Sequence, residues 1–284
     1  MTAQAAAQLH VAPGSETDGR CLPLNGKRAR ISPGSVCTLL REDPELAEAI
    51  PEPRRTRALE ECTSRTARIA VGSWGWEASR HGRDGIGLLV LEGLAASRVS
   101  LQGRCGLELL GEGDLLSAST ADEVWPVLPV ASACSVLLPL RVALLDRDFV
   151  ERHVGRYPEL ATVLVQRALR RSHNLAVQLA IVNQPRVEDR LLLLLWHLAS
   201  RWGRVGRDEV LLDLRLTHAV LAELVAARRP SVSQALSGLA SRGIVRRAGR
   251  GWALTPACGR HDRELGVVHT CNGSHHPDPC GHRR

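Results

Sequence analysis

The sequence predicts an α+β fold with an N-terminal antiparallel β-barrel, a long helix and a C-terminal helix-turn-helix followed by a β-hairpin. Three observations carry this prediction. Short apolar stretches alternate with glycine-rich turns over residues 65–145, as they do in small antiparallel barrels and sandwiches. Residues 147–183 have apolar residues at helical spacing. Residues 217–254 hold two short amphipathic segments, then a strand, a glycine turn and a strand.

The charge balance points to a polyanionic partner. The 284-residue chain has a formal net charge of +7 and is 44% hydrophobic, which is typical of packed domains. Arginine enrichment across a GC-rich genome would also raise the charge, so position is more informative than the total. Residues 211–250 hold seven arginines against Asp213 and Glu223, a net charge of +5. A basic segment of this kind favours nucleic acid.

The N-terminal part, residues 1–55, is predicted to be an extension with one helix. Helical spacing is present over residues 36–50, and Pro51 and Pro53 then break the chain. The N-terminus has no signal-peptide pattern, and the longest apolar run, 191–196, is too short to span a bilayer. We therefore expect a cytoplasmic protein with reduced cysteines.

Residues 56–146 are predicted to form the β-barrel. The expected strands recur at roughly ten-residue intervals, and the alternative is an irregular region rich in loops. The strands are expected at residues 68–71, 87–91, 98–101, 107–110 and 136–145. The glycines expected to separate them are Gly93, Gly103, Gly106, Gly111 and Gly113.

Residues 147–184 are predicted to form one long helix. Its apolar stripe needs a partner surface, either its own domain or a second copy of the chain. A second copy would make this the dimerisation helix. The residues of the candidate dimer interface are Leu160, Leu164, Ala168, Leu175, Leu179 and Val182.

Residues 185–257 are predicted to form a winged helix-turn-helix. A buried helix is expected at 186–201 and an extended segment at 208–216. Thr217 is a good N-cap for the next helix. A second helix is expected to start near 229–231, where Pro230 is tolerated in the first turn. The hairpin after it would be the wing, with Arg250 at its tip.

The second helix has a polar face without acids, since none occurs between Arg228 and Arg250. Such a face can approach phosphates and base edges. An ordinary solvated helix face is the alternative, but such faces usually mix Glu with Arg. The candidate DNA-binding residues are Thr217, His218, Arg228, Arg229, Ser231, Ser233, Gln234, Ser237 and Arg250.

Residues 86–254 resemble the Crp/Fnr family of bacterial regulators. The resemblance is carried by PRVEDRLLLLLWHLASRWG (185–203) and LTHAVLAELVAARRPSVSQALSGLASRGIV (216–245), with a similar cadence in the barrel. It implies a cyclic-nucleotide-binding-like barrel, a homodimer and a near-palindromic DNA site. RNA polymerase and an unidentified small-molecule effector are further partners compatible with this resemblance.

The resemblance implies that Arg229 and Gln234 read bases. Members of the cAMP-binding type often have an acidic residue where this chain has Pro230, so its DNA site is expected to differ from theirs. The family's cyclic-nucleotide cassette has a Gly-Glu pair and a nearby arginine. Here Gly113 is followed by Asp114, and no arginine occurs before Arg141.

The long helix also lacks the Thr-Ser pair with which cAMP-binding members meet the purine. The matching positions are Leu175 and Ala176, whose side chains cannot form hydrogen bonds. We therefore expect no cAMP and no other cofactor. The barrel is either an empty scaffold or the site of a different, less polar effector.

The remaining residues carry no catalytic or metal-binding pattern. The segment 258–284 holds eight Cys and His residues at irregular spacing without a CxxC pair. We expect a disordered tail and no metal, with an accessory metal site as the alternative. No P-loop, GxSxG or HExxH occurs, so an enzyme is not expected. The prediction is a DNA-binding transcription regulator. The alternative is a ligand-sensing or protein-interaction module whose winged helix does not read DNA.

Overall fold

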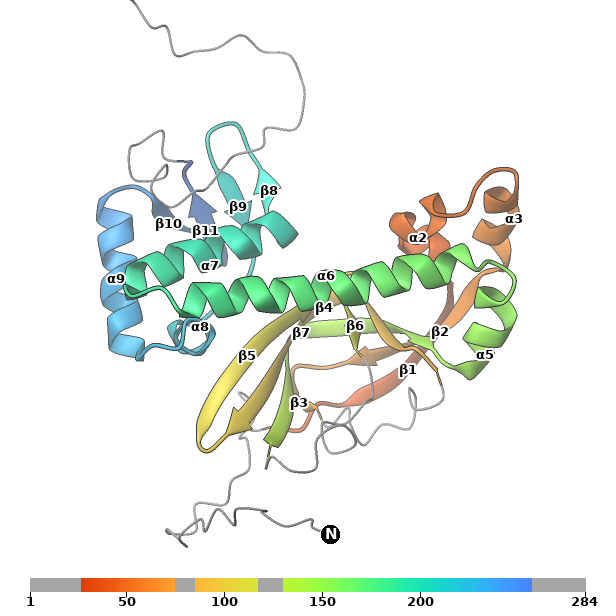
Figure 1. Ribbon diagram of the computed structural model, residues 1–284, viewed down its shortest axis with the longest axis horizontal. Helices are drawn as coiled ribbons and strands as arrows, with labels where there is room; N and C mark the ends of the chain where they lie inside the picture. The colour runs from red at the N-terminus through yellow and green to blue at the C-terminus, as the bar shows by residue number, and fades with distance from the viewer. Residues whose placement is uncertain (1–26, 75–84, 117–129, 257–284) are drawn as a thin grey trace, which may run out of the picture. The chain divides into compact units, whose positions relative to one another are not determined.

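A computed structural model describes residues 27–74, 85–116 and 130–256 (Figure 1). The predicted tail at 258–284 lies outside these residues. The chain divides into two compact units, Met1–Leu175 and Ala176–Arg284. The first holds a β-sheet with helices at its N-terminal and C-terminal ends, and the second holds the helix-turn-helix.

Residues 27–61, the described part of the N-terminal region, contain a strand and three short helices, so the prediction of a single helix over 36–50 was wrong. The elements are β1 (Ile31–Thr38), α1 (Leu39–Glu42), α2 (Pro44–Glu48) and α3 (Arg54–Glu61). Strand β1 is antiparallel to β2, so the sheet begins inside the segment that was expected to be an extension. The side chain of Asp43 accepts a hydrogen bond from the Leu46 amide. This cap starts α2 afresh and separates it from α1.

The pairings between the strands of this sheet are all antiparallel, in agreement with the predicted fold class. Its path is β1-β2-β7-β4-β5, with β3 pairing with β7 and β6 pairing with β4. The added strands are β2 (Thr63–Ile69), β3 (Gly72–Trp74), β4 (Gly87–Leu101), β5 (Arg104–Gly111), β6 (Leu115–Leu116) and β7 (Val130–Leu145).

Strand β4 runs through Gly93, although this glycine was expected to end a strand. Register shifts occur between Val90 and Ala95 where β4 pairs with β7. Gly93 has φ +98°, and a Cβ atom there would lie 2.2 Å from the Pro139 carbonyl oxygen. Only glycine suits this irregular, crowded position. The residue therefore bends the strand rather than terminating it.

Two apolar clusters form the core of the first unit. One, around Val90, Val136 and Val142, consists almost entirely of residues of the sheet. The other joins the N-terminal helices to the sheet and to the long helix, and includes Leu40 and Leu160. The short N-terminal helices are therefore part of the folded unit.

The predicted single helix over 147–183 is interrupted. A short helix, α5 (Arg147–Phe149), continues into a π-helical turn at Val150–Val154, and α6 (Glu159–Val182) starts afresh. Pro158 directly precedes α6. A proline disfavours helical dihedrals in the residue before it, so Tyr157 separates the two helical segments.

One buried and one partly buried ion pair fix helix α6 to the rest of the first unit. Arg167 donates to both carboxylate oxygens of Asp43, at 2.5 and 2.7 Å, and to Glu45 at 2.8 Å. Its side chain is 5% exposed and that of Asp43 is 10% exposed. Farther along the helix, Arg171 makes two hydrogen bonds to Glu108, both 2.8 Å. These pairs set the rotation of α6 about its own axis.

The described part of the second unit, residues 176–256, holds the end of α6, three further helices and a four-stranded sheet, with the order β10-β11-β9-β8. Helix α7 corresponds to the predicted buried helix. The elements are α7 (Val187–Trp202), β8 (Arg204–Val205), β9 (Val210–Leu212), α8 (His218–Leu224), α9 (Arg229–Ser241), β10 (Val245–Ala248) and β11 (Gly251–Leu254). Within the described ranges, no helix combines the length and apolarity needed to cross a membrane.

The Arg167–Asp43 pair predicts a large stability effect. Arg167→Ala leaves the Asp43 carboxylate buried without its partner, which costs about 3–5 kcal/mol. Arg170→Ala is the matched control, since Arg170 is 56% exposed and also binds Glu45; it should cost about 1 kcal/mol or less. Denaturant unfolding of the full chain measures both. Equal losses for the two variants would contradict this account.

Candidate nucleic-acid interface

Helices α8 and α9 form a helix-turn-helix held by local interactions. The Thr217 hydroxyl accepts a hydrogen bond from the Val220 amide at 3.3 Å, so Thr217 caps α8 as predicted. The turn contains Ala226, whose φ of +49° lies in the left-handed region. Helix α9 begins at Arg229 with Pro230 in its first turn. Both helix starts therefore match the sequence prediction.

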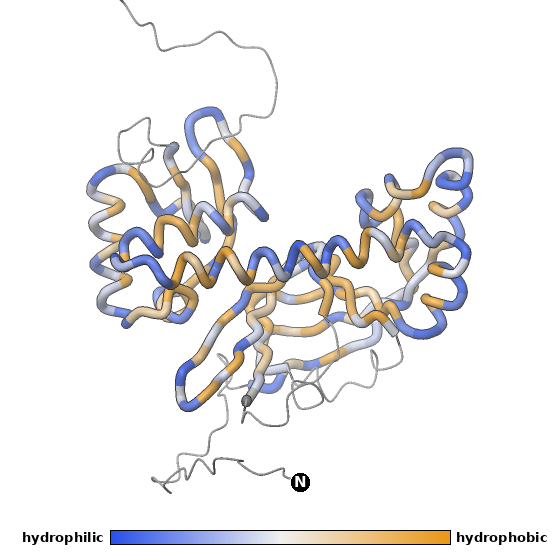
Figure 2. Tube along the Cα trace, viewed as in Figure 1, coloured by the Kyte–Doolittle hydropathy of each residue, from blue (hydrophilic) through white to orange (hydrophobic). Residues whose placement is uncertain are grey.

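Helix α9 separates an apolar face from a polar one, as the hydropathy colouring of Figure 2 shows along its length. The apolar side chains Val232, Ala235, Leu236 and Leu239 are at most 8% exposed. On the other side Arg229, Gln234 and Ser237 are exposed. The helix ends at Ser241 with Arg242 as its C-cap, and Gly243 then takes φ +70°, the usual conformation after a helix end. The polar face is thus presented on a well-terminated helix.

A β-hairpin follows α9, confirming the predicted strand–turn–strand. Strands β10 and β11 pair antiparallel, with Ala248 opposite Gly251. Gly249 and Arg250 therefore form the turn, and Arg250 is exposed at its tip. The guanidinium of Arg247 lies 4.4 Å from the centre of the Trp252 ring. This stacking holds one arginine against the hairpin itself.

The arginines of this segment differ in their partners. Arg242 pairs with Glu188, and Arg246 makes two 2.7 Å hydrogen bonds to Glu209. Within the part of the chain that the structure describes, no acidic partner is found for Arg228, Arg229 or Arg250. These three are exposed, so their charge is available to an anion.

The predicted DNA-binding residues lie in three places. Thr217 and His218 lie at the start of α8, Arg250 lies at the hairpin tip, and the others lie on α9 or directly before it. His218 and Ser233 meet across the two helices, with Nδ1 and Oγ 2.8 Å apart. Spacing along the sequence gave no indication of this pair, because it depends on how α8 packs against α9.

Helix α6 exposes an apolar face that contains only some of the residues predicted for the dimer interface. Leu160 is 1% exposed and Leu164 4% exposed, and both pack in the core of their own unit. The face repeats with alternating spacings of four and three residues. Its exposed residues are Val165, Ala168, Ser172, Leu175 and Leu179, and the half-buried Ala161 and Val182 lie at its two ends.

This face keeps four of the six predicted residues and drops the two buried ones. Val165 is 58% exposed and Leu179 62% exposed. Val165 was missed, although a heptad pattern starting at Ala161 would have found it. Helix α6 has two apolar stripes, one buried and one exposed, and their residues alternate along the sequence. The spacing alone therefore did not separate the two stripes.

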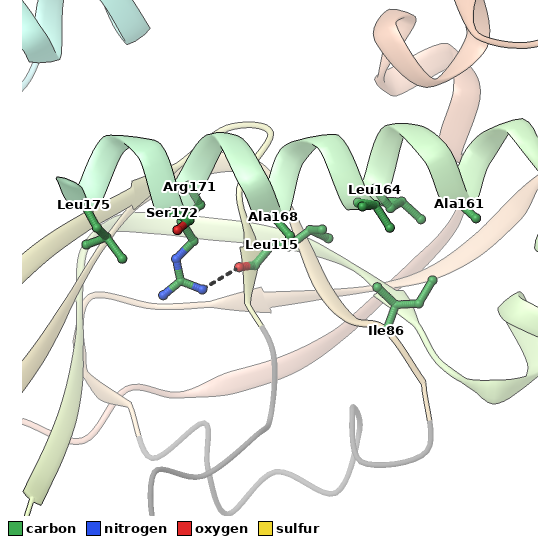
Figure 3. Close-up of a pocket in the computed structure, with 9 residues that line it drawn as sticks. Ile86, Leu115, Ala161, Leu164, Ala168, Arg171, Ser172 and Leu175 are labelled. Atoms are coloured by element: carbon green, nitrogen blue, oxygen red, sulfur yellow. Dashed lines mark hydrogen bonds between the residues drawn. The ribbon is translucent and has the colours of Figure 1, made fainter. Parts of the chain in front are cut away.

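An apolar cavity of about 640 Å³ lies in the first unit beside α6. Figure 3 shows α6 side chains, among them Ala168 and Leu175, along one side, with Ile86 and Leu115 opposite. Its cation, Arg171, already binds Glu108, and this contact raises the pKa of Arg171 above its usual value. The cavity therefore suits an uncharged, mainly apolar molecule.

A family model described as a Crp-like helix-turn-helix domain matches residues 189–255. The match takes in α8, α9 and the hairpin, together with most of α7. Residues 189–255 are therefore similar to Crp-like helix-turn-helix domains. The resemblance to Crp/Fnr regulators noted in the sequence is thereby confirmed where it was strongest.

A relative from Mycobacterium tuberculosis, named a CRP-like cAMP-activated global transcriptional regulator, is 28% identical over 148 residues. The match covers 51% of this chain and 63% of the relative, less than two thirds of its length. A CooA variant from Carboxydothermus hydrogenoformans has a TM-score of 0.53 at 14% identity, covering 84% of this chain and 96% of CooA.

FixK2 from Bradyrhizobium japonicum has a TM-score of 0.50 at 16% identity, covering 69% of this chain and 92% of FixK2. At this level of identity the two structures show a shared fold. They confirm the predicted fold class.

The left-handed Ala226 in the turn of the Crp-like domain predicts a stabilising substitution. Ala226→Gly removes a backbone strain of roughly 1–2 kcal/mol and should raise the free energy of unfolding by up to about 1 kcal/mol. Ala240→Gly, at an exposed helical position in α9, should lower it by about 0.5–1 kcal/mol. Thermal or urea unfolding of the full chain measures both, and a loss for Ala226→Gly would refute the argument.

Proposed function

We propose that this protein is a sequence-specific DNA-binding transcription regulator of the Crp/Fnr type, acting in the cytoplasm as a homodimer on a near-palindromic site. The observation that carries the proposal is the exposed, acid-free polar face of α9 within the Crp-like domain. Arg229 and Gln234 on this face are suited to pair with base edges in the major groove. Arg228 and Arg250 flank it as cations for phosphates.

The dimer is supported by the exposed face of α6. Its heptad spacing is the pattern that two parallel helices bury between them. Leu175 and Leu179 are 43% and 62% exposed in the single chain. Two copies joined along this face would present two α9 helices to one DNA duplex, so the bound site would have two-fold symmetry.

Regulation without cAMP is supported by Asp114, which follows Gly113, and by Arg141, the first arginine after it. Residues 117–129, which hold most of the expected cassette, lie outside the described residues. The Asp114 carboxylate accepts a hydrogen bond from the Gly111 amide at 2.8 Å, so it is used within its own turn. Arg141 binds Glu42 and Glu92, each at 2.7 Å. Neither side chain is therefore left free to bind a cyclic phosphate. The name of the mycobacterial relative, by contrast, describes that protein as cAMP-activated.

A different effector is the second possibility for the first unit, and the apolar cavity beside α6 favours it. The cavity volume falls within the range of small-molecule sites. An uncharged, mainly apolar ligand fits its lining better than a cyclic nucleotide does, because the lining is aliphatic apart from Ser172 and Arg171, and Arg171 is paired with Glu108. RNA polymerase remains a candidate partner of the DNA-bound form.

Selection of sequences from a random duplex DNA pool tests this proposal. The purified protein should enrich a motif with two-fold symmetry, equally well with and without cAMP. Arg229→Ala together with Gln234→Ala should abolish the enrichment. Arg250→Ala should weaken binding to all sequences alike and reduce the salt dependence of log K by about one unit.

Each part of this experiment has a result that would contradict the proposal. Enrichment that requires cAMP would contradict the argument from Asp114 and Arg141. Binding that is insensitive to salt would favour the alternative, a protein-interaction module whose winged helix does not read DNA. Failure to enrich any motif would count against the DNA-binding proposal.

The dimer makes a separate prediction. Val165→Asp with Leu179→Asp places two charges in the proposed interface and should convert the dimer to a monomer in sedimentation velocity. Val205→Asp is the control, since Val205 is 87% exposed in β8 and outside this face. A double variant that sediments like the wild-type dimer would show that α6 is not the interface.

A further inference from the structure

The hydrogen bond between His218 and Ser233 joins the two helices of the proposed DNA-reading unit. The His218 Nδ1 and Ser233 Oγ atoms are 2.8 Å apart, and both residues are half-buried. This contact is a side-chain link between the start of α8 and the helix that carries Arg229 and Gln234. The inference drawn from it rests on the proposed function.

The hydroxyl of Ser233 has a different partner from the hydroxyls of Ser237 and Ser241, which lie farther along α9. The hydroxyls of Ser237 and Ser241 donate back to carbonyls of their own helix, at 3.0 and 2.9 Å. The Ser233 hydroxyl instead meets an imidazole nitrogen. A neutral imidazole has one nitrogen that donates and one that accepts, so Nδ1 can take the single hydroxyl hydrogen of Ser233.

The position of Ser233 places this hydroxyl close to the base-reading residues. Ser233 follows Arg229 by four residues, about 40° around the helix, and directly precedes Gln234. A serine hydroxyl with a free hydrogen can donate to a base or accept from one. Once its hydrogen is donated to His218, the oxygen offers only lone pairs.

We propose that His218 makes Ser233 an acceptor-only contact and so restricts the base that Ser233 meets. In the major groove the amino donors are the N4 group of cytosine and the N6 group of adenine. The motif should therefore contain one position per half-site at which cytosine or adenine is favoured. His218 is a positioning residue here, since it acts through Ser233.

Sequence selection from the random duplex pool at pH 8 tests this inference. The wild-type protein should show the restricted position, and Ser233→Ala should lose it. His218→Ala should broaden it to all four bases, with discrimination falling about three- to tenfold, the value of one hydrogen bond. The rest of the motif should be unchanged.

His218→Asn is the variant that separates hydrogen bonding from packing. The Asn Oδ1 atom is attached to Cγ, as Nδ1 is in histidine, so it can accept the same hydrogen. This variant should retain the restricted position. Ser241→Ala is the matched control, because Ser241 lies in the last turn of α9 and away from His218. It should leave the whole motif unchanged, and thermal midpoints verify that all variants are folded.

Three results would overturn the inference. His218→Ala could select the wild-type motif with unchanged discrimination, which would show that Ser233 does not depend on His218. His218→Asn could behave like His218→Ala, which would assign His218 a packing role. A wild-type protein that enriches no motif would overturn the proposed function and this inference together, whereas the first two results leave the proposed function intact.

Discussion

Helix α6 has two apolar faces, and a single domain can cover only one side of a helix. The first unit buries the face that contains Leu160, Val163 and Leu164. The rotation of the helix is set by the ion pairs of Arg167 and Arg171, which leave the heptad face exposed. Because the free energy of burying Arg167 depends on Asp43, the N-terminal helices help to decide which face of α6 is available to a partner. The position of the proposed dimer interface thus depends on a charge pair 124 residues apart in sequence.

The helix-turn-helix and its hairpin could be predicted from the sequence because their signals are local. Thr217 caps a helix that begins at the next residue, and Pro230 is tolerated only because it lies in a first turn. The turn at Gly249 and Arg250 is flanked by the two strands that it joins. In each case the residue and its partner are a few positions apart, so one window of sequence contains both.

Features that depend on distant partners could not be predicted in the same way. Strand β1 contains Pro33 and Gly34, which weaken a strand pattern, and it forms because β2 pairs with it from more than twenty residues away. Gly93 bends β4 because β7 approaches it at Pro139. The acid-free face of α9 was visible in the sequence, but the contact of His218 with Ser233 required the packing angle of two helices.

The cavity and the exposed face of α6 share residues, among them Ala161, Val165 and Leu175. A second copy packed along this face would complete part of the cavity wall. A ligand bound there would contact both copies in the proposed dimer, and its affinity would depend on how the two helices lie against each other. Ligand binding and the arrangement of the two helices would then be thermodynamically linked. The ligand would shift the equilibrium between arrangements only as far as it binds one of them more tightly than another.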